Sequence, residues 1–190
     1  ATTIEVLTPD FMRKPGAEPI RFKTATNPVS CLAFGLEGKI LATAGRDGVV
    51  RLWNADTRES WFGGTGFLGR AAQAAGGLVP SALNFFSRKP DRDPNSLTGH
   101  VGGITSLAFG RGINKSAIVV GSGDGTVRMW DLSKAPPTVE TLTAFESAVS
   151  GIEFSPNGNL LAAASWDGTI RFWDLRRSDR TPSVLQGHHG

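Results

Sequence analysis

Short apolar runs separated by turn residues recur in three segments of the chain. The segments are VSCLAFGLEGKILATAGRDGVVRLWN from Val29, ITSLAFGRGINKSAIVVGSGDGTVRMWD from Ile104 and VSGIEFSPNGNLLAAASWDGTIRFWD from Val149. In each segment a short apolar strand leads through a turn to a strand rich in small residues, and a third strand ends in tryptophan. This repetition predicts an all-β protein made of antiparallel meanders.

An Asp-Gly pair stands before the third strand of every segment. The pairs are Asp47-Gly48, Asp124-Gly125 and Asp167-Gly168. Asp-Gly favours the positive φ values of a two-residue hairpin turn, so each pair is predicted to join adjacent antiparallel strands. Trp130 and Trp173 lie 43 residues apart, which fits the period of about 40 to 45 residues of one four-stranded propeller blade.

With these repeats, the chain resembles the WD-repeat β-propeller family. The signature dipeptide is matched by Trp130-Asp131 and Trp173-Asp174, and nearly matched by Trp53-Asn54. The family's Gly-His pair, which precedes the first strand of a blade, is matched by Gly99-His100 and Gly187-His188. The resemblance implies a partial β-propeller of about three and a half four-stranded antiparallel blades, with a long insertion in one blade.

The resemblance also divides the chain into blades. Residues 1–28 would form the last two strands of a preceding blade, and residues 29–57 with 96–103 the next one, interrupted by an insertion at 58–95. Residues 104–148 would form a third blade, and residues 149–190 a blade that ends at the start of another repeat. Because open sheet edges favour aggregation, we expect residues outside this segment, or another chain, to complete the ring.

One group of residues in the second repeat contains the chemical groups of a serine hydrolase. Ser122, His100 and Asp124 could act as nucleophile, base and orienting carboxylate, but a nucleophile also needs an open pocket and an oxyanion site. In the family, a strand tryptophan, a hydroxyl, the Gly-His histidine and the turn aspartate form a buried hydrogen-bond chain. The resemblance therefore implies a structural chain of His100, Ser122, Asp124 and Trp130, and no enzyme activity.

The other repeats are expected to hold only parts of this chain. In the first repeat Ala25 and Gly45 would occupy the histidine and hydroxyl positions, and in the third Phe145 would replace the histidine. The members that remain are Asp47, Trp53, Ser165, Asp167, Trp173 and His188. A single further histidine, His189, beside the lone Cys31 makes no metal site, so we expect neither a metal nor another cofactor.

Glycines in WFGGTGFLGR, residues 61–70, are spaced as in the nucleotide-binding turn of extended short-chain dehydrogenases. A dinucleotide loop must follow a parallel strand and open a helix, whereas a polar turn precedes Gly63 and Gly76-Gly77 soon follows. We therefore expect no nucleotide binding.

The apolar residues of the insertion instead predict packing beneath its own propeller, docking to a partner subunit, or membrane or lipid contact through residues 61–86. The aromatic candidates are Trp61, Phe62, Phe67, Phe85 and Phe86.

Composition narrows the function classes further. The 20 basic and 17 acidic residues are interspersed and leave a net charge of only +3. This charge pattern does not favour a nucleic-acid partner. The lone Cys31 fits a reducing compartment, so we expect an intracellular protein, cytoplasmic or nuclear. Nothing in the sequence predicts a small-molecule substrate.

Two features point to protein partners. The residue before each turn aspartate should point from one face of the ring, and these residues are Arg46, Gly123 and Trp166. An exposed tryptophan with arginine nearby is typical of an interface anchor, although Trp166 could instead cover a neighbouring blade.

Residues 160–176 also resemble the extended Trp-Asp-x-Arg motif of cullin-RING ubiquitin ligase substrate receptors, with Arg176 as the discriminating residue. We therefore expect a non-enzymatic scaffold for protein–protein interaction in a larger assembly, with a ligase receptor or a lipid-binding protein as alternatives.

Overall fold

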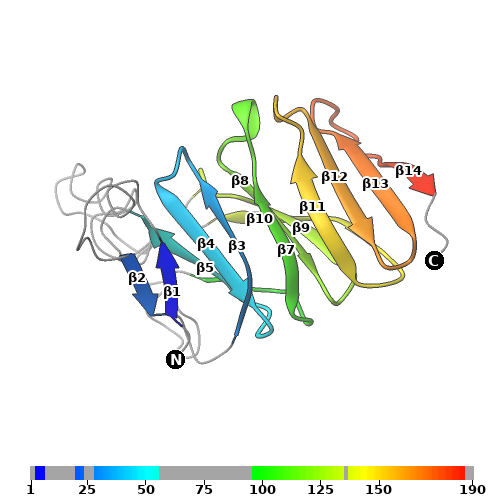
Figure 1. The fold of residues 1–190 in the computed structure, drawn as a ribbon. Helices are drawn as coiled ribbons and strands as arrows, with labels where there is room; N and C mark the ends of the chain where they lie inside the picture. The colour runs from blue at the N-terminus through cyan, green and yellow to red at the C-terminus, as the bar shows by residue number, and fades with distance from the viewer. Residues whose placement is uncertain (1–2, 7–19, 24–27, 56–95, 135–136, 187–190) are drawn as a thin grey trace.

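The computed structural model describes residues 3–6, 20–23, 28–55, 96–134 and 137–186. Within these ranges the chain forms β-strands and one short 3-10 helix, η1 (Gly112–Asn114). The strands build three four-stranded antiparallel sheets and one hairpin, which stand side by side (Figure 1). The all-β architecture of a partial propeller is thereby confirmed. No helix in these ranges is long and apolar enough to cross a bilayer.

Each sheet follows the order of its strands in the chain. The first contains β3 (Val29–Gly35), β4 (Ile40–Gly45), β5 (Val50–Asn54) and β6 (Ser96–Leu97). The second contains β7 (Ile104–Phe109), β8 (Ala117–Ser122), β9 (Thr126–Asp131) and β10 (Thr138–Ala144). The third contains β11 (Val149–Phe154), β12 (Leu160–Ser165), β13 (Thr169–Asp174) and β14 (Ser183–Gln186). The hairpin pairs β1 (Thr3–Val6) with β2 (Ile20–Lys23).

The predicted Asp-Gly turns join the second and third strands of all three sheets. The turn glycines have positive φ angles of 70° at Gly48, 80° at Gly125 and 84° at Gly168. Strand pairing then places each tryptophan opposite an apolar residue, in the pairs Leu41 with Trp53, Ile118 with Trp130, and Leu161 with Trp173. The three segments that repeat in the sequence therefore fold in the same register.

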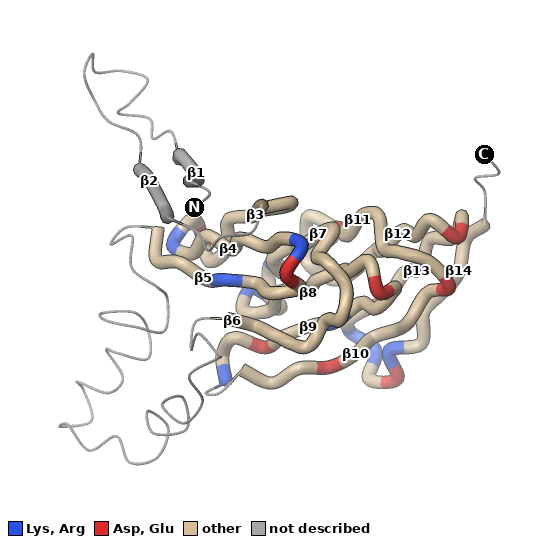
Figure 2. Tube along the Cα trace, turned by 90° about the horizontal axis from the view of Figure 1, so that it is seen from below, with Lys and Arg blue, Asp and Glu red and all other residues tan. Residues whose placement is uncertain are grey.

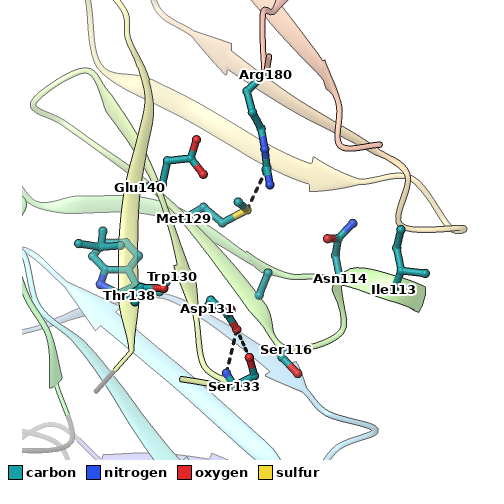
Figure 3. A pocket seen from close by; sticks show the side chains of 12 residues that line it. Ile113, Asn114, Ser116, Met129, Trp130, Asp131, Ser133, Thr138, Glu140 and Arg180 are labelled. Carbon is teal, nitrogen blue, oxygen red and sulfur yellow. Dashed lines mark hydrogen bonds between the residues drawn. The ribbon is translucent and has the colours of Figure 1, made fainter. Parts of the chain in front are cut away.

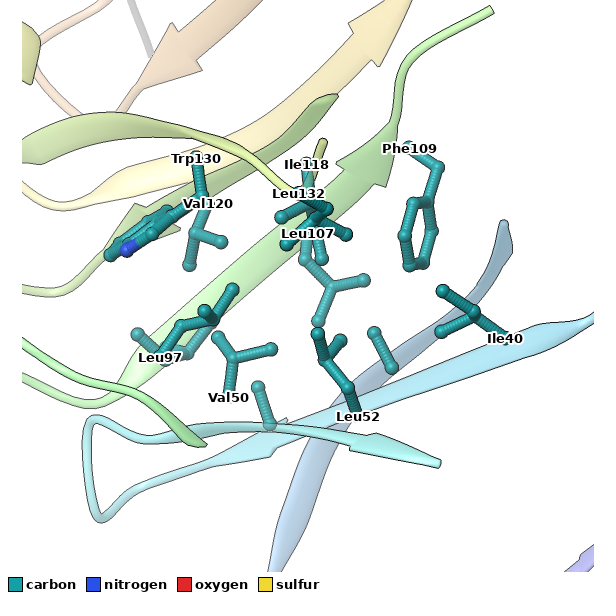
Figure 4. Packing of buried hydrophobic residues seen from close by; sticks show 13 residues of the cluster. Ile40, Val50, Leu52, Leu97, Leu107, Phe109, Ile118, Val120, Trp130 and Leu132 are labelled. Atoms are coloured by element: carbon teal, nitrogen blue, oxygen red, sulfur yellow. The ribbon is translucent and has the colours of Figure 1, made fainter. Parts of the chain in front are cut away.

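Hydrophobic cores lie between neighbouring sheets. One cluster joins the first two sheets and includes Leu52, Phe109 and Trp130 (Figure 4). The other joins the second and third sheets and includes Phe154 and Trp173. The two tryptophans are only 3% and 0% exposed, respectively. Each thus packs against the sheet that precedes its own in the chain.

The innermost strands β3, β7 and β11 connect the sheets through hydrogen bonds as well. The Ser30 hydroxyl on β3 donates to the Ile104 carbonyl on β7 over 2.5 Å. The Ser106 hydroxyl on β7 accepts the Ile152 N–H of β11 over 3.1 Å. The pairing of each inner strand also shifts register near its start, as a β-bulge does. A serine hydroxyl on an inner strand therefore helps to join each pair of neighbouring sheets, from a different strand position in each case.

Candidate functional site

The three Asp-Gly turns lie on one side of the sheets, which we call the Asp-Gly face and which Figure 2 shows from below. As predicted for their positions, Arg46, Gly123 and Trp166 are all exposed there. Trp166 is 76% exposed, and its indole therefore covers none of the three described sheets. Its backbone N–H donates to the Ala148 carbonyl over 3.0 Å. The tryptophan therefore projects from a fixed backbone.

Asp124 ties its hairpin turn to the chain that enters the second sheet. Its Oδ1 accepts hydrogen bonds from the Thr126 N–H over 2.9 Å and the Thr126 hydroxyl over 2.6 Å. Its Oδ2 accepts the Val101 N–H over 2.8 Å and lies 3.4 Å from Nδ1 of His100. The His100 side chain is 1% exposed. The turn and the connection from β6 to β7 are thus held together by one carboxylate.

The environment of this pair fixes its charge. Burial would raise the pKa of Asp124, but hydrogen bonds from Thr126 and Val101 and the nearby His100 hold that pKa well below its ordinary value. Burial has the largest effect on the pKa of His100 and lowers it. Asp124 raises this pKa, Arg128 lowers it, and the net result is a pKa below the ordinary value. At neutral pH an ionised carboxylate therefore lies beside a neutral imidazole.

The predicted path from His100 through Ser122 to Trp130 is not what the structure contains. The Ser122 hydroxyl donates to the Gly103 carbonyl over 3.1 Å and accepts the Asp124 N–H over 3.2 Å. Nε2 of His100 is buried and has no hydrogen-bond partner among the described residues. The His100 ring does contact Trp130, with 5.7 Å between the ring centroids. A Ser-His-Asp relay needs a hydrogen bond between Ser122 and His100. Because the hydrogen bonds of the Ser122 hydroxyl go to Gly103 and Asp124 instead, these three residues do not form such a relay.

The first sheet shows where the hydroxyl belongs. Although the resemblance places Gly45 at the hydroxyl position, the indole N–H of Trp53 donates to the Thr43 hydroxyl over 2.9 Å. Thr43 lies four residues before the turn aspartate Asp47, whereas the predicted hydroxyl position lies two residues before it, at Gly45. The turn aspartate Asp47 also has a partner that the sequence did not predict, since Arg51 pairs with it over 2.7 Å. The positions in the other sheets that match Thr43 in register are Val120 and Ala163, and neither carries a hydroxyl.

The third sheet repeats the turn contacts of the second. Oδ1 of Asp167 accepts the N–H and hydroxyl of Thr169, and its Oδ2 accepts the Glu146 N–H over 3.2 Å. In place of a histidine, Phe145 lies under the Arg171 guanidinium, 4.4 Å from the ring centroid, a cation–π arrangement. The predicted members Ser165 and Trp173 do not meet, since Ser165 donates to the Ser147 carbonyl and the Trp173 indole N–H is buried without a partner in the described chain.

Arg176, the arginine of the Trp-Asp-x-Arg motif, lies on the surface and is 61% exposed. It binds Asp174 through two hydrogen bonds, from Nε over 2.8 Å and from Nη2 over 2.6 Å. These bonds hold the pKa of Asp174 at about 2. The arginine is thus paired within its own chain, and a role of Arg176 in joining a cullin-RING ubiquitin ligase stays a prediction that rests on the motif alone.

Several predicted site residues lie outside the described residues. They are Trp61, Phe62, Phe67, Phe85, Phe86 and His188, together with Ala25, the insertion 58–95 and its glycine-rich stretch. In the described part of the chain, no three side chains of His, Cys, Asp or Glu gather in a way that could hold a metal ion. The predictions of lipid contact and of no nucleotide binding therefore remain predictions.

A hollow of about 380 Å³ lies beside β9 and β10 (Figure 3). Arg180 reaches into it and contacts the Met129 sulfur over 3.7 Å. Glu140 and Asp131 also line it, and Asp131 accepts hydrogen bonds from the N–H and hydroxyl of Ser133. Charges of both signs occur together here, so the hollow favours no particular class of ligand.

The repeated four-stranded sheets, their Asp-Gly turns and the tryptophans buried between sheets define the chain as part of a β-propeller. The family model described as "WD domain, G-beta repeat" matches residues 18–54, 93–131 and 137–174. These matches cover more than half of the chain. The chain therefore belongs to the WD-repeat family.

Three relatives show how far the likeness extends. The chain is 28% identical over 149 residues to the guanine nucleotide-binding protein subunit beta of Schizosaccharomyces pombe, covering 73% of this chain and 48% of the relative. It is 26% identical over 152 residues to protein tipD of Dictyostelium discoideum, with coverage of 75% and 24%. It is 30% identical over 156 residues to periodic tryptophan protein 2 of Arabidopsis thaliana, with coverage of 76% and 17%. The chain thus spans less than half the length of each of these relatives.

Proposed function

We propose that this chain is a non-enzymatic scaffold that binds a partner protein through its Asp-Gly face, with Trp166 as the anchor. WD-repeat proteins act in general as platforms for protein–protein interaction, and the exposed Trp166 indole carries this more specific proposal. Tryptophan is enriched among the residues that dominate binding energy at protein interfaces. Here it projects from a turn whose backbone is fixed by Asp167, so little conformational entropy would be lost on binding.

Other residues on the Asp-Gly face support a protein partner. Val101 on the same face is 95% exposed, and its backbone is held in place by Asp124. Arg46 and Glu146 are exposed there as well. Apolar groups surrounded by charges of both signs are typical of the rim and centre of a protein interface.

The separation of Ser122 from His100 supports a role without catalysis.

An intracellular location forms part of the same proposal. Cys31 is a free thiol on β3, and burial raises its pKa. A chain that keeps an unpaired thiol within its packed sheets suits a reducing compartment.

Affinity purification of the full chain from its own cells tests the proposal. We expect at least one stoichiometric partner to be retained by the wild type and recovered at least tenfold less well with Trp166→Ala, since truncation of an interface anchor typically costs 2 kcal/mol or more. Val184→Ala is the matched control, because Val184 is a 52% exposed apolar residue on β14, away from the Asp-Gly turns. Equal recovery of every partner by the wild type and both variants would refute the role of Trp166.

A further inference from the structure

A groove of about 710 Å³ lies on the face opposite the Asp-Gly turns, between the first and second sheets. One wall is the turn between β3 and β4, and the other is the connection between β7 and β8. Leu36 and Leu132 provide apolar surface in it, and both pack against the core between the two sheets. The basic residues Lys39, Arg111 and Lys115 line the same groove. It therefore combines an apolar patch with positive charge.

The wall formed by the β3–β4 turn has an unusual and well-fixed backbone. Leu36 and Glu37 have φ angles of 48° and 59°, in the left-handed region that residues with bulky side chains rarely occupy. The turn is closed by a hydrogen bond from the Gly38 N–H to the Gly35 carbonyl over 3.1 Å. A second bond runs from the Ala55 N–H to the Lys39 carbonyl over 2.9 Å. Such conformations persist where the surrounding structure determines them, so this wall keeps its shape without a ligand.

The opposite wall is anchored on both of its sides. The Leu132 N–H donates to the Ser116 carbonyl over 2.8 Å within the second sheet. On the side of the third sheet, the Asn114 amide donates to the Gly158 carbonyl over 2.9 Å. A groove between two fixed walls is a preformed site, which lowers the entropic cost of binding an extended segment.

The positive charge of the groove is largely unbalanced. Among the described residues, the side chains of Lys39 and Lys115 form no ion pair. Arg111 has only a long contact of 3.9 Å with Glu153, and both of these side chains are well exposed. Glu37 is the single acidic residue in the lining. Clefts lined by one sign of charge attract ligands of the opposite sign.

We propose that this groove binds an acidic peptide segment of a partner protein. An apolar side chain of the segment would pack on Leu36 and Leu132, and its carboxylates would lie against Lys39, Arg111 and Lys115. A nucleic-acid strand fits the groove less well, because strand-binding sites stack bases on aromatic side chains and the lining contains none. The site is separate from Trp166, so the chain would hold two protein ligands on opposite faces.

Fluorescence anisotropy with labelled peptide libraries tests this proposal on the full chain. The acidic library has the pattern Glu-Glu-x-Glu-Glu with an apolar residue at x, and the comparison libraries carry Gln or Lys in place of Glu. We expect the acidic library to bind at least tenfold more tightly than the Gln library at low salt, and more weakly as salt rises. We expect Lys39→Glu and Lys115→Glu each to weaken its binding by about tenfold.

Arg177→Glu is the matched control, because it makes the same change of charge at an exposed position outside the groove. Binding of the acidic library that survives Arg177→Glu and is lost in both groove variants would support the site. The proposal is overturned by equal binding of the Gln and Glu libraries, or by equal losses in all three variants. It is also overturned if poly(U) RNA or phosphatidylserine vesicles bind the groove more tightly than the acidic library, because either result would show a different class of ligand. Trp166→Ala should leave peptide binding unchanged, which separates this test from that of the Asp-Gly face.

Discussion

One strand position that repeats in the three sheets carries a hydroxyl in the first sheet only. Thr43, Val120 and Ala163 lie opposite Arg51, Arg128 and Arg171 in their strand pairings. Only Thr43 carries a hydroxyl, and it accepts the indole N–H of Trp53. Among the described residues of the other two sheets, Nε2 of His100 and the indole N–H of Trp173 are buried and unpaired. Unpaired buried polar groups cost about 1 to 3 kcal/mol each.

Val120→Thr is therefore expected to stabilise the chain. Threonine has nearly the shape of valine, and Val120 is fully buried in the cluster that contains Trp130 (Figure 4). A hydroxyl there would lie at the position that Thr43 holds in the first sheet, in the same cluster as Trp130, whose ring contacts His100. We expect the free energy of unfolding, measured by urea denaturation, to rise by about 0.5 to 1.5 kcal/mol.

The reverse exchange, Thr43→Val, provides the control for this prediction. It removes the hydroxyl that Trp53 uses and should lower the free energy of unfolding by about 1 to 3 kcal/mol. If Val120→Thr destabilises the chain as much as Thr43→Val does, the hydroxyl has no partner at position 120 and the equivalence of the two positions is wrong.

At the scale of the strands, the apolar runs and the Asp-Gly pairs were sufficient to predict the three sheets. Each strand is short and bounded by turn residues, so local pattern and register point to the same structure.

The hydrogen-bond chain could not be predicted as well. The sequence favours Ser122 as the hydroxyl of the chain, because a serine stands two residues before the turn aspartate Asp124 and a valine, Val120, stands four residues before it. Strand pairing and side-chain packing decide which of several nearby hydroxyls forms a hydrogen bond with a ring nitrogen. The sequence pattern does not show this pairing and packing directly. The pair of Arg51 with Asp47 was missed for the same reason.

Close packing of the second and third sheets leaves no room for a Cβ atom at the strand glycine Gly121. A Cβ atom at Gly121 on β8 would lie 2.4 Å from Cγ1 of Val149 and 2.9 Å from Cδ1 of Ile152, both on β11. At Gly151, also on β11, a Cβ atom would meet nothing within 4 Å. We expect Gly121→Ala to lower the free energy of unfolding by about 1 to 3 kcal/mol through overpacking. Gly151→Ala should be neutral or slightly stabilising. Thermal denaturation followed by circular dichroism measures both, and equal midpoints for the two variants would contradict this account of the β8–β11 contact.

At the scale of the whole molecule, burial of equivalent residues depends on the neighbouring sheet. Phe109 on β7 and Phe154 on β11 are 7% and 2% exposed, because each packs against the sheet before it. Phe34 occupies the same place on β3 and is 47% exposed, and Leu32 beside it is 50% exposed. The first sheet thus presents the apolar surface with which the other two sheets bind their neighbours. This surface supports the expectation that a further sheet completes the packing.

Truncation of these phenylalanines should reveal the difference in burial. Phe154→Ala is expected to lower the free energy of unfolding of the chain by about 3 to 5 kcal/mol, the usual cost of removing a buried phenylalanine. Phe34→Ala should cost less than half as much, because about half of its side chain is already in contact with water. Urea denaturation of the two variants and the wild type gives the comparison. In a longer polypeptide in which another sheet covers β3, the cost of Phe34→Ala should rise toward that of Phe154→Ala. An equal cost in the present chain would mean that Phe34 is already covered in solution, for instance by a second copy, and sedimentation of the wild type would then show a dimer that Phe34→Ala dissociates.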